Sequence, residues 1–233
     1  MPEIMKLYHG STAIIDSLEI GKGNTHNDYG LGFYCTESPE LAKEWACSSR
    51  SGGFVNTYSL DTAGLNIMNL TDPSHSILGW LAVIVKNRVF DITSQLAVEA
   101  RAYLTKNFLP DFEAYDAIRG YRADDSYFAF AMDFLSNTIS LRQLNRAMSL
   151  GSLGEQFVLK SSKAFETIHF DGSEPVDGSV YFSRRRKRDR EAREQYLINE
   201  RRSSYRIDDI FILDILRGEM KQGDARLQGD IPS

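Results

Sequence analysis

The stretch that most constrains the fold of this chain runs from residue 28 to residue 46 and reads DYGLGFYCTESPELAKEWA. Its glycines allow a tight approach of the backbone, because they carry no Cβ. Residues 33–35 (FYC) favour a short strand, in which neighbouring side chains point to opposite faces. Ser38 followed by Pro39 is the N-cap and first-position pair of a helix. The sequence therefore predicts a strand that leads directly into a helix.

Two aromatic residues of this stretch are candidates for ligand binding. Trp45 lies four residues after Leu41, so both side chains share one side of the predicted helix. Tyr34, on the strand, could face Trp45 across a gap that fits a flat ligand. Packing of the strand against the helix is the alternative interpretation, and the stretch taken alone favours it.

The composition excludes several classes of protein. The chain has 233 residues, 42% of them hydrophobic and 25% charged, which is typical of a globular protein. Its formal net charge of −5 gives no general attraction to nucleic acid or to an anionic membrane. The most apolar run, residues 80–85, is too short to span a bilayer, and the first residues carry no secretory signal. Cys35 and Cys47 have neither metal-ligand spacing nor a disulfide framework. We therefore expect a cytoplasmic protein that binds no metal and no membrane.

Short apolar segments alternate with amphipathic ones along the chain, which predicts a series of short strands and helices. The first strand places His9 at its carboxyl end, where strands often deliver functional side chains, although a lone histidine is more often structural. The expected strands are residues 5–11, 33–35, 54–60, 115–120, 155–160 and 180–182, and the expected helices after residue 46 are 74–89, 92–108, 127–135, 140–148 and 162–168.

The composition changes at residue 184. Residues 184–206 hold ten basic and four acidic residues. Interspersed acids favour a solvated helix with internal ion pairs, and a patch that binds RNA or DNA is the alternative. Residues 207–216 are apolar enough to dock on the main body, and residues 218–233 are expected to fray. We therefore expect one domain over residues 1–183 and a basic helical extension over residues 184–233, packed on that domain.

Three short motifs lie far apart in the sequence: YHGS at 8–11, GFYCT at 32–36 and EQFVLKS at 155–161. Their order and form resemble the ADP-ribosyltransferase superfamily, in the branch whose triad is histidine, tyrosine and glutamate. More narrowly, the chain resembles a family of uncharacterised bacterial proteins assigned to that superfamily. Longer phrases carry this narrower resemblance: GYRADDSYFAF (120–130), NTISLRQLNRAM (137–148), LGEQFVLKSSKAFE (153–166) and EPVDGSVYF (174–182). The resemblance implies an α+β fold, a split β-sandwich of two small sheets flanked by helices, with an NAD cleft between the sheets.

The resemblance also implies roles for residues of the first two motifs. His9 matches the histidine that binds a ribose hydroxyl of NAD, and Gly10 matches the residue whose backbone binds the nicotinamide amide. The adjacent Ser11 belongs to the same NAD-binding set. Tyr34 matches the tyrosine that stacks on the nicotinamide ring, and Trp45 falls where a second aromatic closes the sandwich. Aromatic rings prefer offset stacking on such flat ligands.

The third motif departs from the family's pattern. Where the triad has a glutamate, this chain has Gln156, which can form the hydrogen bond to the ribose 2′-hydroxyl but supplies no charge and no general base. Glu155 is adjacent, but neighbours on a strand face opposite ways. Branches that modify arginine carry a glutamate where this chain has Gly154, which argues against arginine as the acceptor. Asp124 and Asp125 are candidate auxiliary carboxylates, with helix capping as their commoner role.

The expected function is NAD-dependent ADP-ribosyl transfer to a macromolecular acceptor, protein or nucleic acid, with release of nicotinamide. His9, Tyr34 and Gln156 are the expected catalytic residues, and NAD is the co-substrate. The family context implies a toxin or defence role and a small neutralising partner protein. Because Gln156 replaces the glutamate, a module that binds NAD or a nucleotide without turnover is an alternative, and so is an NAD glycohydrolase.

Overall fold

A computed structural model describes residues 3–72, 74–89, 94–123, 125–148, 150 and 154–230. Its contacts divide the chain into two compact units that interleave along the sequence. The first comprises Met1–Asn69, Asp111–Arg122 and Leu153–Arg188, and the second comprises Leu70–Pro110, Ala123–Ser152 and Asp189–Ser233. This division differs from the single boundary at residues 183 and 184 that the sequence predicts, because segments 70–110 and 123–152 group with the carboxyl-terminal residues.

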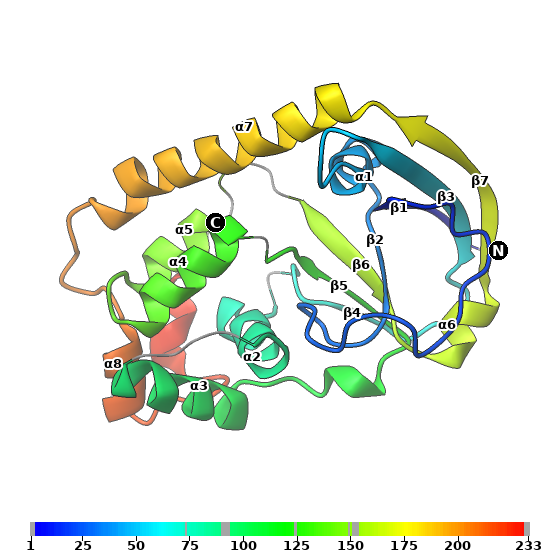
Figure 1. Cartoon of the computed structure of the whole chain (residues 1–233). Coiled ribbons are helices and arrows are strands. Elements are labelled where there is room, and N and C mark those ends of the chain that lie inside the picture. The colour runs from blue at the N-terminus through cyan, green and yellow to red at the C-terminus, as the bar shows by residue number, and fades with distance from the viewer. Residues whose placement is uncertain are drawn as a thin grey trace. The chain divides into compact units, whose positions relative to one another are not determined.

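The first unit contains every strand that the structure describes, in two small sheets flanked by helices, so the α+β class predicted from the sequence is confirmed (Figure 1). Its strands are β1 (Ile4–Ser11), β2 (Phe33–Cys35), β3 (Gly53–Asp61), β4 (Ile67–Asn69), β5 (Ala117–Tyr121), β6 (Glu155–Leu159) and β7 (Ile168–Val176). Its helical elements are α1 (Pro39–Ala46), the 3₁₀ turn η1 (Phe112–Ala114), α6 (Ser162–Glu166) and the first part of α7 (Gly178–Tyr196).

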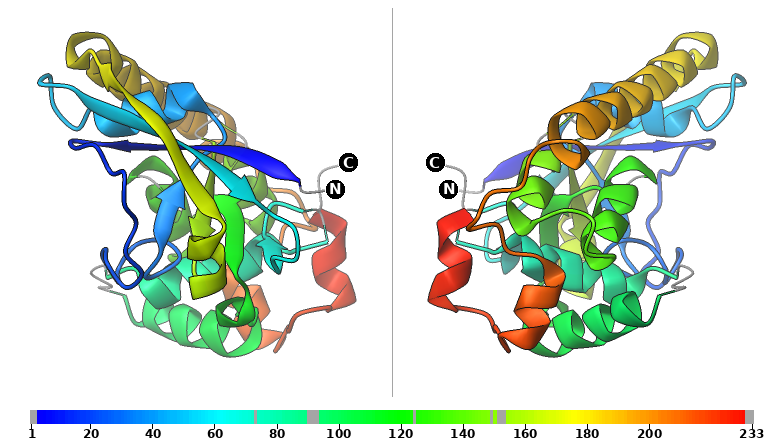
Figure 2. Two further views of the ribbon diagram at one scale, coloured as in Figure 1. Left: turned by 90° about the vertical axis from the view of Figure 1, so that its right-hand side faces the viewer. Right: turned by 90° about the vertical axis from the view of Figure 1, so that its left-hand side faces the viewer.

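The sheets differ in their topology. The three-stranded sheet has the order β1-β3-β7 and is antiparallel throughout. The left view of Figure 2 brings its edge strand β7, in olive, to the front. The four-stranded sheet has the order β2-β6-β5-β4, in which only β4 and β5 run parallel. Strand β6 therefore lies between β2 and β5, although it follows both of them in the sequence.

The two sheets pack face to face around one hydrophobic cluster. Leu7 and Tyr58 enter it from the three-stranded sheet, and Cys35 and Phe157 enter it from the four-stranded sheet. Each of these side chains is at most 1% exposed. This core fills the described interface between the sheets, and the side chain of Tyr34 lies outside it. That side chain follows Phe33 and precedes Cys35 on β2, and so it points to the opposite face.

Helix α1 covers the other face of the three-stranded sheet. Ser38 is its N-cap and accepts a hydrogen bond from the backbone N–H of Leu41, as the sequence predicts. Ala42 and Ala46 pack in a second hydrophobic cluster with Val55 of β3. These small side chains let the backbones of helix and sheet come close together.

The first turns of α7 are held against α1 by ion pairs. Arg184 contacts Glu40 at 3.0 Å, and Arg188 contacts Glu44 at 2.5 Å, with the Arg188 and Glu44 side chains 16% and 12% exposed. Further along α7, Arg193 pairs with Asp189 on the next turn of the same helix. These contacts fit the predicted ion-paired helix.

The second unit is helical in the part that the structure describes. Its elements are α2 (Ile77–Asn87), α3 (Gln95–Asn107), α4 (Asp125–Leu135), α5 (Leu141–Ala147), the remainder of α7, the π-helical turn η3 (Leu197–Arg201), α8 (Ile212–Arg217) and the 3₁₀ turn η4 (Ala225–Asp230). Arg142 of α5 donates two hydrogen bonds to Asp209, and the backbone N–H of Leu141 donates to the carbonyl of Ile210. Ile212 and Ile215 of α8 are fully buried, so the segment predicted to dock does pack on other helices.

One predicted strand is wrong, and two strands, β4 and β7, were not predicted. Residues 180–182 (VYF) form the first turn of α7, where Asp177 accepts hydrogen bonds from the backbone N–H groups of Ser179 and Tyr181. The strand that pairs with β3 is β7, immediately before this helix. Most of its side chains are at least partly exposed because it lies at the edge of its sheet, so it lacks the apolar alternation that identifies a strand.

Candidate functional site

Among the residues that the structure describes, one isolated backbone bridge joins the two sheets, and beyond it their strands diverge. Tyr8 of β1 and Thr36 exchange two backbone hydrogen bonds, of 2.8 and 2.9 Å. Backbone groups of alternate residues point to the same edge of a strand. The N–H and C=O of Gly10 therefore point to the same edge as those of Tyr8. The bridge is isolated, so β2 forms no ladder with Gly10 there. This edge offers one donor and one acceptor to a ligand.

Gly10 lacks a side chain for a structural reason as well. A Cβ at this position would lie 1.9 Å from the carbonyl oxygen of Ala42 and 2.6 Å from the backbone nitrogen of Ala46. Both atoms belong to the backbone of α1, so they cannot rotate away. Gly10 thus lets α1, which carries Trp45, pack closely against the face of the sheet at β1.

His9 spans the gap between the diverging strands. Its Nδ1 lies 2.6 Å from the backbone oxygen of Tyr34, and its ring centroid is 4.8 Å from that of Phe33. Burial lowers the pKa of His9 below its usual value, which favours the neutral ring. A carbonyl oxygen can only accept, so Nδ1 carries the proton and Nε2 is the acceptor nitrogen. A neutral histidine held in this tautomer can accept a hydrogen bond from a ligand hydroxyl.

Tyr34 is fixed through its hydroxyl by the loop that precedes β2. The hydroxyl donates to the carbonyl of Gly30 at 2.6 Å and accepts from the N–H of Tyr29 at 3.0 Å. Gly30 has a φ of 73°, which suits glycine. Burial raises the pKa of Tyr34, so its hydroxyl stays protonated. The loop therefore holds the ring in one place and keeps its hydroxyl from other partners.

Gln156 lies on the same face of the four-stranded sheet as Tyr34. Tyr34 pairs with Val158 across β2 and β6, and Gln156 is two residues from Val158, so its side chain points the same way. Its Nε2 donates to Oδ2 of Asp28 at 2.6 Å. The exposed fractions of Gln156 and Asp28 are 5% and 8%. A carboxylate thus touches the residue that replaces the expected glutamate.

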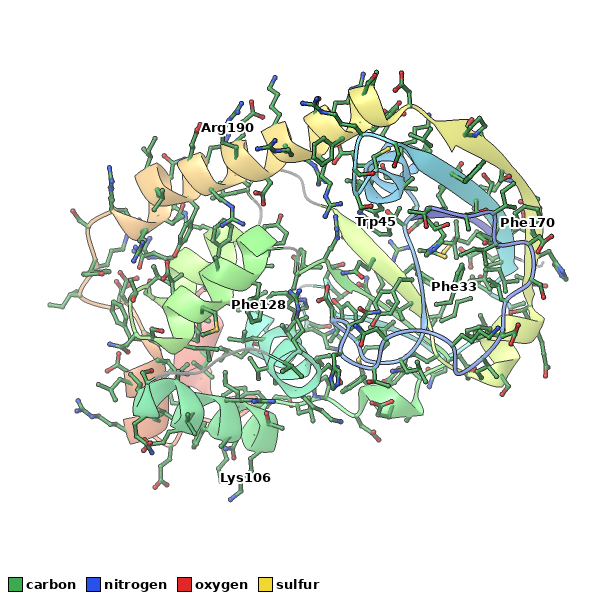
Figure 3. The ribbon with its side chains drawn as sticks, viewed as in Figure 1. Phe33, Trp45, Lys106, Phe128, Phe170 and Arg190 are labelled. Carbon is green, nitrogen blue, oxygen red and sulfur yellow. The ribbon has the colours of Figure 1, made fainter. Side chains whose placement is uncertain are left out.

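Trp45 projects from α1, as Figure 3 shows, and its indole meets the end of β5. The guanidinium carbon of Arg122 lies 5.0 Å from the ring centroid, so a cation covers one ring face. Within the described part of the chain, the buried indole Nε1 has no hydrogen-bond partner. No ring contact between Trp45 and Tyr34 occurs among the described residues. The predicted gap between the two aromatics is therefore compatible with the structure, but only one face of Trp45 is left for a ligand.

Ser11 serves the turn after β1 rather than an open site. Its hydroxyl donates to the carbonyl of Ala13 at 2.5 Å and accepts from the side-chain amide of Asn56 at 3.2 Å. Asn56 is fully buried and also donates to the carbonyl of Ala13. These hydrogen bonds give Ser11 a structural role. By contrast, the side chain of His9 reaches toward β2, and the backbone N–H and C=O of Gly10 lie at the edge of β1.

A cavity of about 310 Å³ lies where β6 begins and α1 starts. This volume is at the lower end of small-molecule sites. Of the predicted site residues, only Gln156 lines the cavity. Arg119, which forms ion pairs with Glu37 and with Glu155, lies in its wall. Glu155 therefore faces away from the Asp28 side of β6, as the alternation of the strand predicts.

The structure thus brings His9, Gly10, Tyr34 and Gln156 to one corner of the first unit, with Trp45 on the adjoining helix. Of the auxiliary carboxylates, Asp124 lies outside the described residues, and so does the side chain of Asp125, with which α4 begins. Sequence reasoning missed Asp28 and Arg122. Neither has a local signal, because their partners are distant in the sequence. Among the described residues, no group of histidine, cysteine and acidic side chains could hold a metal ion.

Comparison with known proteins places the chain in a family. A family model described as "Protein of unknown function (DUF3990)" matches residues 5–170. The chain belongs to the DUF3990 family. No curated protein and no solved structure matches it significantly. The DUF3990 match spans every predicted site residue and ends inside β7, before α7 begins. No described helix of this DUF3990 chain is long and apolar enough to cross a membrane.

Proposed function

We propose that this DUF3990 protein is an NAD-dependent ADP-ribosyltransferase with the split β-sandwich fold of that superfamily. The observation that carries the proposal is the convergence of three distant motifs at the open corner between β1 and β2. There Nδ1 of His9 is hydrogen-bonded to the backbone oxygen of Tyr34 at 2.6 Å. The adjacent Gly10 lies on β1 beyond the isolated bridge, where β2 forms no ladder with it. Tyr34 and Gln156 share one face of the neighbouring strands β2 and β6.

A primary carboxamide fits the edge at Gly10. Like a peptide group, it has one carbonyl acceptor and an N–H donor, so it can pair with the backbone of Gly10 as a strand residue would. The aromatic rings of Tyr34 and Trp45 offer stacking surfaces for the ring that carries such a group. The neutral Nε2 of His9 is an acceptor for a ribose hydroxyl. NAD combines a carboxamide, a flat ring and ribose hydroxyls in one molecule.

In the proposed reaction the bond between the ribose C1′ and the nicotinamide nitrogen breaks, and its electron pair leaves with nicotinamide. Positive charge develops on the ribose as this bond lengthens. A nucleophilic atom of the acceptor then bonds to C1′ and releases a proton. Oε1 of Gln156 accepts a hydrogen bond from the ribose 2′-hydroxyl. The rings of Tyr34 and Trp45 stack on the nicotinamide that leaves.

Nicotinamide release tests this function. Wild-type protein is incubated with isotope-labelled NAD and cell lysate, and Gln156→Ala and Gln195→Ala are run beside it. Gln195 is an exposed residue of α7 and serves as the matched control. We expect Gln156→Ala to lower release about 100-fold, as for loss of one transition-state contact, and Gln195→Ala to match wild type. Label in the protein or nucleic-acid fraction then identifies the class of acceptor.

Other outcomes of this experiment would replace the proposal. Nicotinamide release without labelled macromolecule would make the protein an NAD glycohydrolase. Calorimetric binding of NAD without any release would make it a binding module, the alternative that Gln156 keeps open. If the wild type neither binds nor cleaves NAD, the proposal is wrong.

A further inference from the structure

The contact between Asp28 and Gln156 fixes which way the glutamine amide points. An ionised carboxylate accepts hydrogen bonds and has none to donate. The NH₂ group of the amide must therefore point toward Asp28. This agrees with the 2.6 Å hydrogen bond from Nε2 of Gln156 to Oδ2 of Asp28. Oε1 then points away from Asp28. In the described part of the chain, no hydrogen bond to Oε1 is formed by another residue.

The backbone next to Asp28 is fixed by several hydrogen bonds, and these hold the carboxylate that orients the Gln156 amide. The next residue, Tyr29, is fully buried, and its hydroxyl donates to the carbonyl of Tyr121 at 2.7 Å. Lys160 of the segment after β6 donates to the carbonyl of Tyr29 at 2.8 Å. Gly120, on β5, leaves the space that the Tyr29 hydroxyl occupies. Bonds on several strands thus fix the backbone beside Asp28.

We infer that Asp28 is a positioning residue that lets Gln156 act as the glutamate does in the reaction proposed above. The inference rests on that proposed function. Asp28 presents Oε1 of Gln156 as an acceptor for the ribose 2′-hydroxyl. It also places a negative charge one hydrogen bond behind that acceptor, and the charge polarises the amide. As the C1′–nitrogen bond breaks, positive charge develops on the ribose. The carboxylate of Asp28 stabilises this charge without touching the substrate.

A charge exchange between the two positions tests this inference. We expect Asp28→Asn to lower kcat for nicotinamide release about 100-fold and to change KM for NAD by less than about threefold, because the lost stabilisation belongs to the transition state. The double variant Asp28→Asn with Gln156→Glu restores one carboxylate and one amide, and we expect its kcat within about tenfold of wild type. Asp16→Asn, at an exposed aspartate, is the matched control.

A second measurement applies where a variant fails to fold. In ¹⁵N-labelled wild-type protein, the side-chain NH₂ of Gln156 is followed by NMR, with the exposed Gln195 as reference. We expect slow hydrogen exchange and a downfield proton for Gln156, since one N–H is bonded to a buried carboxylate. Exchange as fast as that of Gln195 would contradict the inference.

The outcomes separate this inference from the proposed function. If wild type releases nicotinamide and folded Asp28→Asn does so equally fast, the inference is wrong and the proposed function stands. If Asp28→Asn lowers only the melting temperature, Asp28 is structural and the inference is again wrong. If wild type cleaves no NAD while the Gln156 amide is protected, the proposed function fails, and the inference about catalysis fails with it.

Discussion

The hydroxyl of Tyr34 has a structural role that is separate from the role proposed for its ring. It forms hydrogen bonds with the backbone of Tyr29 and of Gly30, in the loop that directly follows Asp28. The ring is thereby held on the face that Gln156 shares. Phenylalanine would keep the ring and lose only these bonds, so the two roles can be separated experimentally.

Tyr34→Phe should lower the free energy of unfolding by about 1–3 kcal/mol, because it leaves a backbone donor and acceptor of the loop without their partner. Tyr205→Phe is the control, since that hydroxyl bonds the carbonyl of Thr138 from a side chain in a residue that is 57% exposed. We expect the control to stay within about 0.5 kcal/mol of wild type. Urea denaturation measures both variants, and equal effects would contradict the structural role of the Tyr34 hydroxyl.

His9 predicts a pH dependence of stability. Burial lowers its pKa in the folded protein, whereas the unfolded chain has a pKa of about 6.5. Below about pH 6.5 the unfolded state therefore binds more protons, and folding loses stability as the pH falls toward the lowered pKa. His9→Asn retains a side-chain N–H donor without titrating. The unfolding free energy of wild type should drop more than that of His9→Asn between about pH 8 and about pH 5, and parallel curves would refute this.

At the scale of elements, the close contact of α1 with β1 decides where Trp45 lies. The helix approaches so closely that only a glycine fits at position 10, and the α7 arginines hold α1 from its exposed side. Arg184 and Arg188 are thus occupied by α1 carboxylates, which weakens the interpretation of the basic segment as a nucleic-acid patch. A shift of α1 would therefore displace Trp45.

Gly10→Ala should therefore destabilise the protein by about 1–3 kcal/mol, because its Cβ must push the backbone of α1 away. Gly79→Ala is the matched control, since the nearest atom to its Cβ is the carbonyl oxygen of Phe108 at 3.6 Å. As a helical position in α2, it should gain about 0.5–1 kcal/mol. Chemical denaturation of the two variants gives the comparison. A neutral Gly10→Ala would show that α1 is free to move.

The sequence predicted most elements because their signals are local. Ser38, Ser76 and Ser140 cap the helices that follow them, as serine before an amphipathic segment indicates. Strand β7 escaped prediction because an edge strand with polar side chains lacks an alternating pattern. The triplet at 180–182 was misassigned because three apolar residues cannot distinguish a strand from a helical turn.

The candidate site was predictable only in part. His9, Gly10, Tyr34 and Gln156 stand in short motifs, and the structure brings these motifs together. Asp28 could not be assigned, because its contact with Gln156 joins residues 128 positions apart, and only the pairing of β2 with β6 creates it. The turn that Ser11 forms with Asn56 depends on the register of β1 and β3, which no single-sequence pattern specifies.

At the scale of the whole molecule, the two units share one chain that passes between them repeatedly. The carboxyl-terminal residues complete the second unit, where Asp209 anchors α5 and α8 is buried. They are part of the fold rather than an extension of it. Removal of these residues should destabilise helices that are distant in the sequence, such as α5, which contacts Asp209.

A fragment that ends at residue 183 should therefore fail to fold cooperatively, although the sequence predicts a domain boundary there. It lacks Tyr196 and Asp209, which contact α4 and α5, and it lacks α8, which packs on α3. A fragment that ends at residue 223 keeps them and serves as the control. Thermal unfolding followed by circular dichroism compares the two. A cooperative transition of the shorter fragment near the wild-type temperature would contradict the interleaved organisation.

The position of β6 has a consequence for the synthesis of the protein. This strand lies between β2 and β5 but leaves the ribosome after both of them. Until residue 159 emerges, the nascent chain carries strands β2 and β5 without the strand that pairs them, and their apolar side chains await a partner. Gln156 arrives on that same late strand. Under the proposed function, a nascent chain in the producing cell would hold no working NAD site until β6 has emerged, which ends at residue 159 of 233.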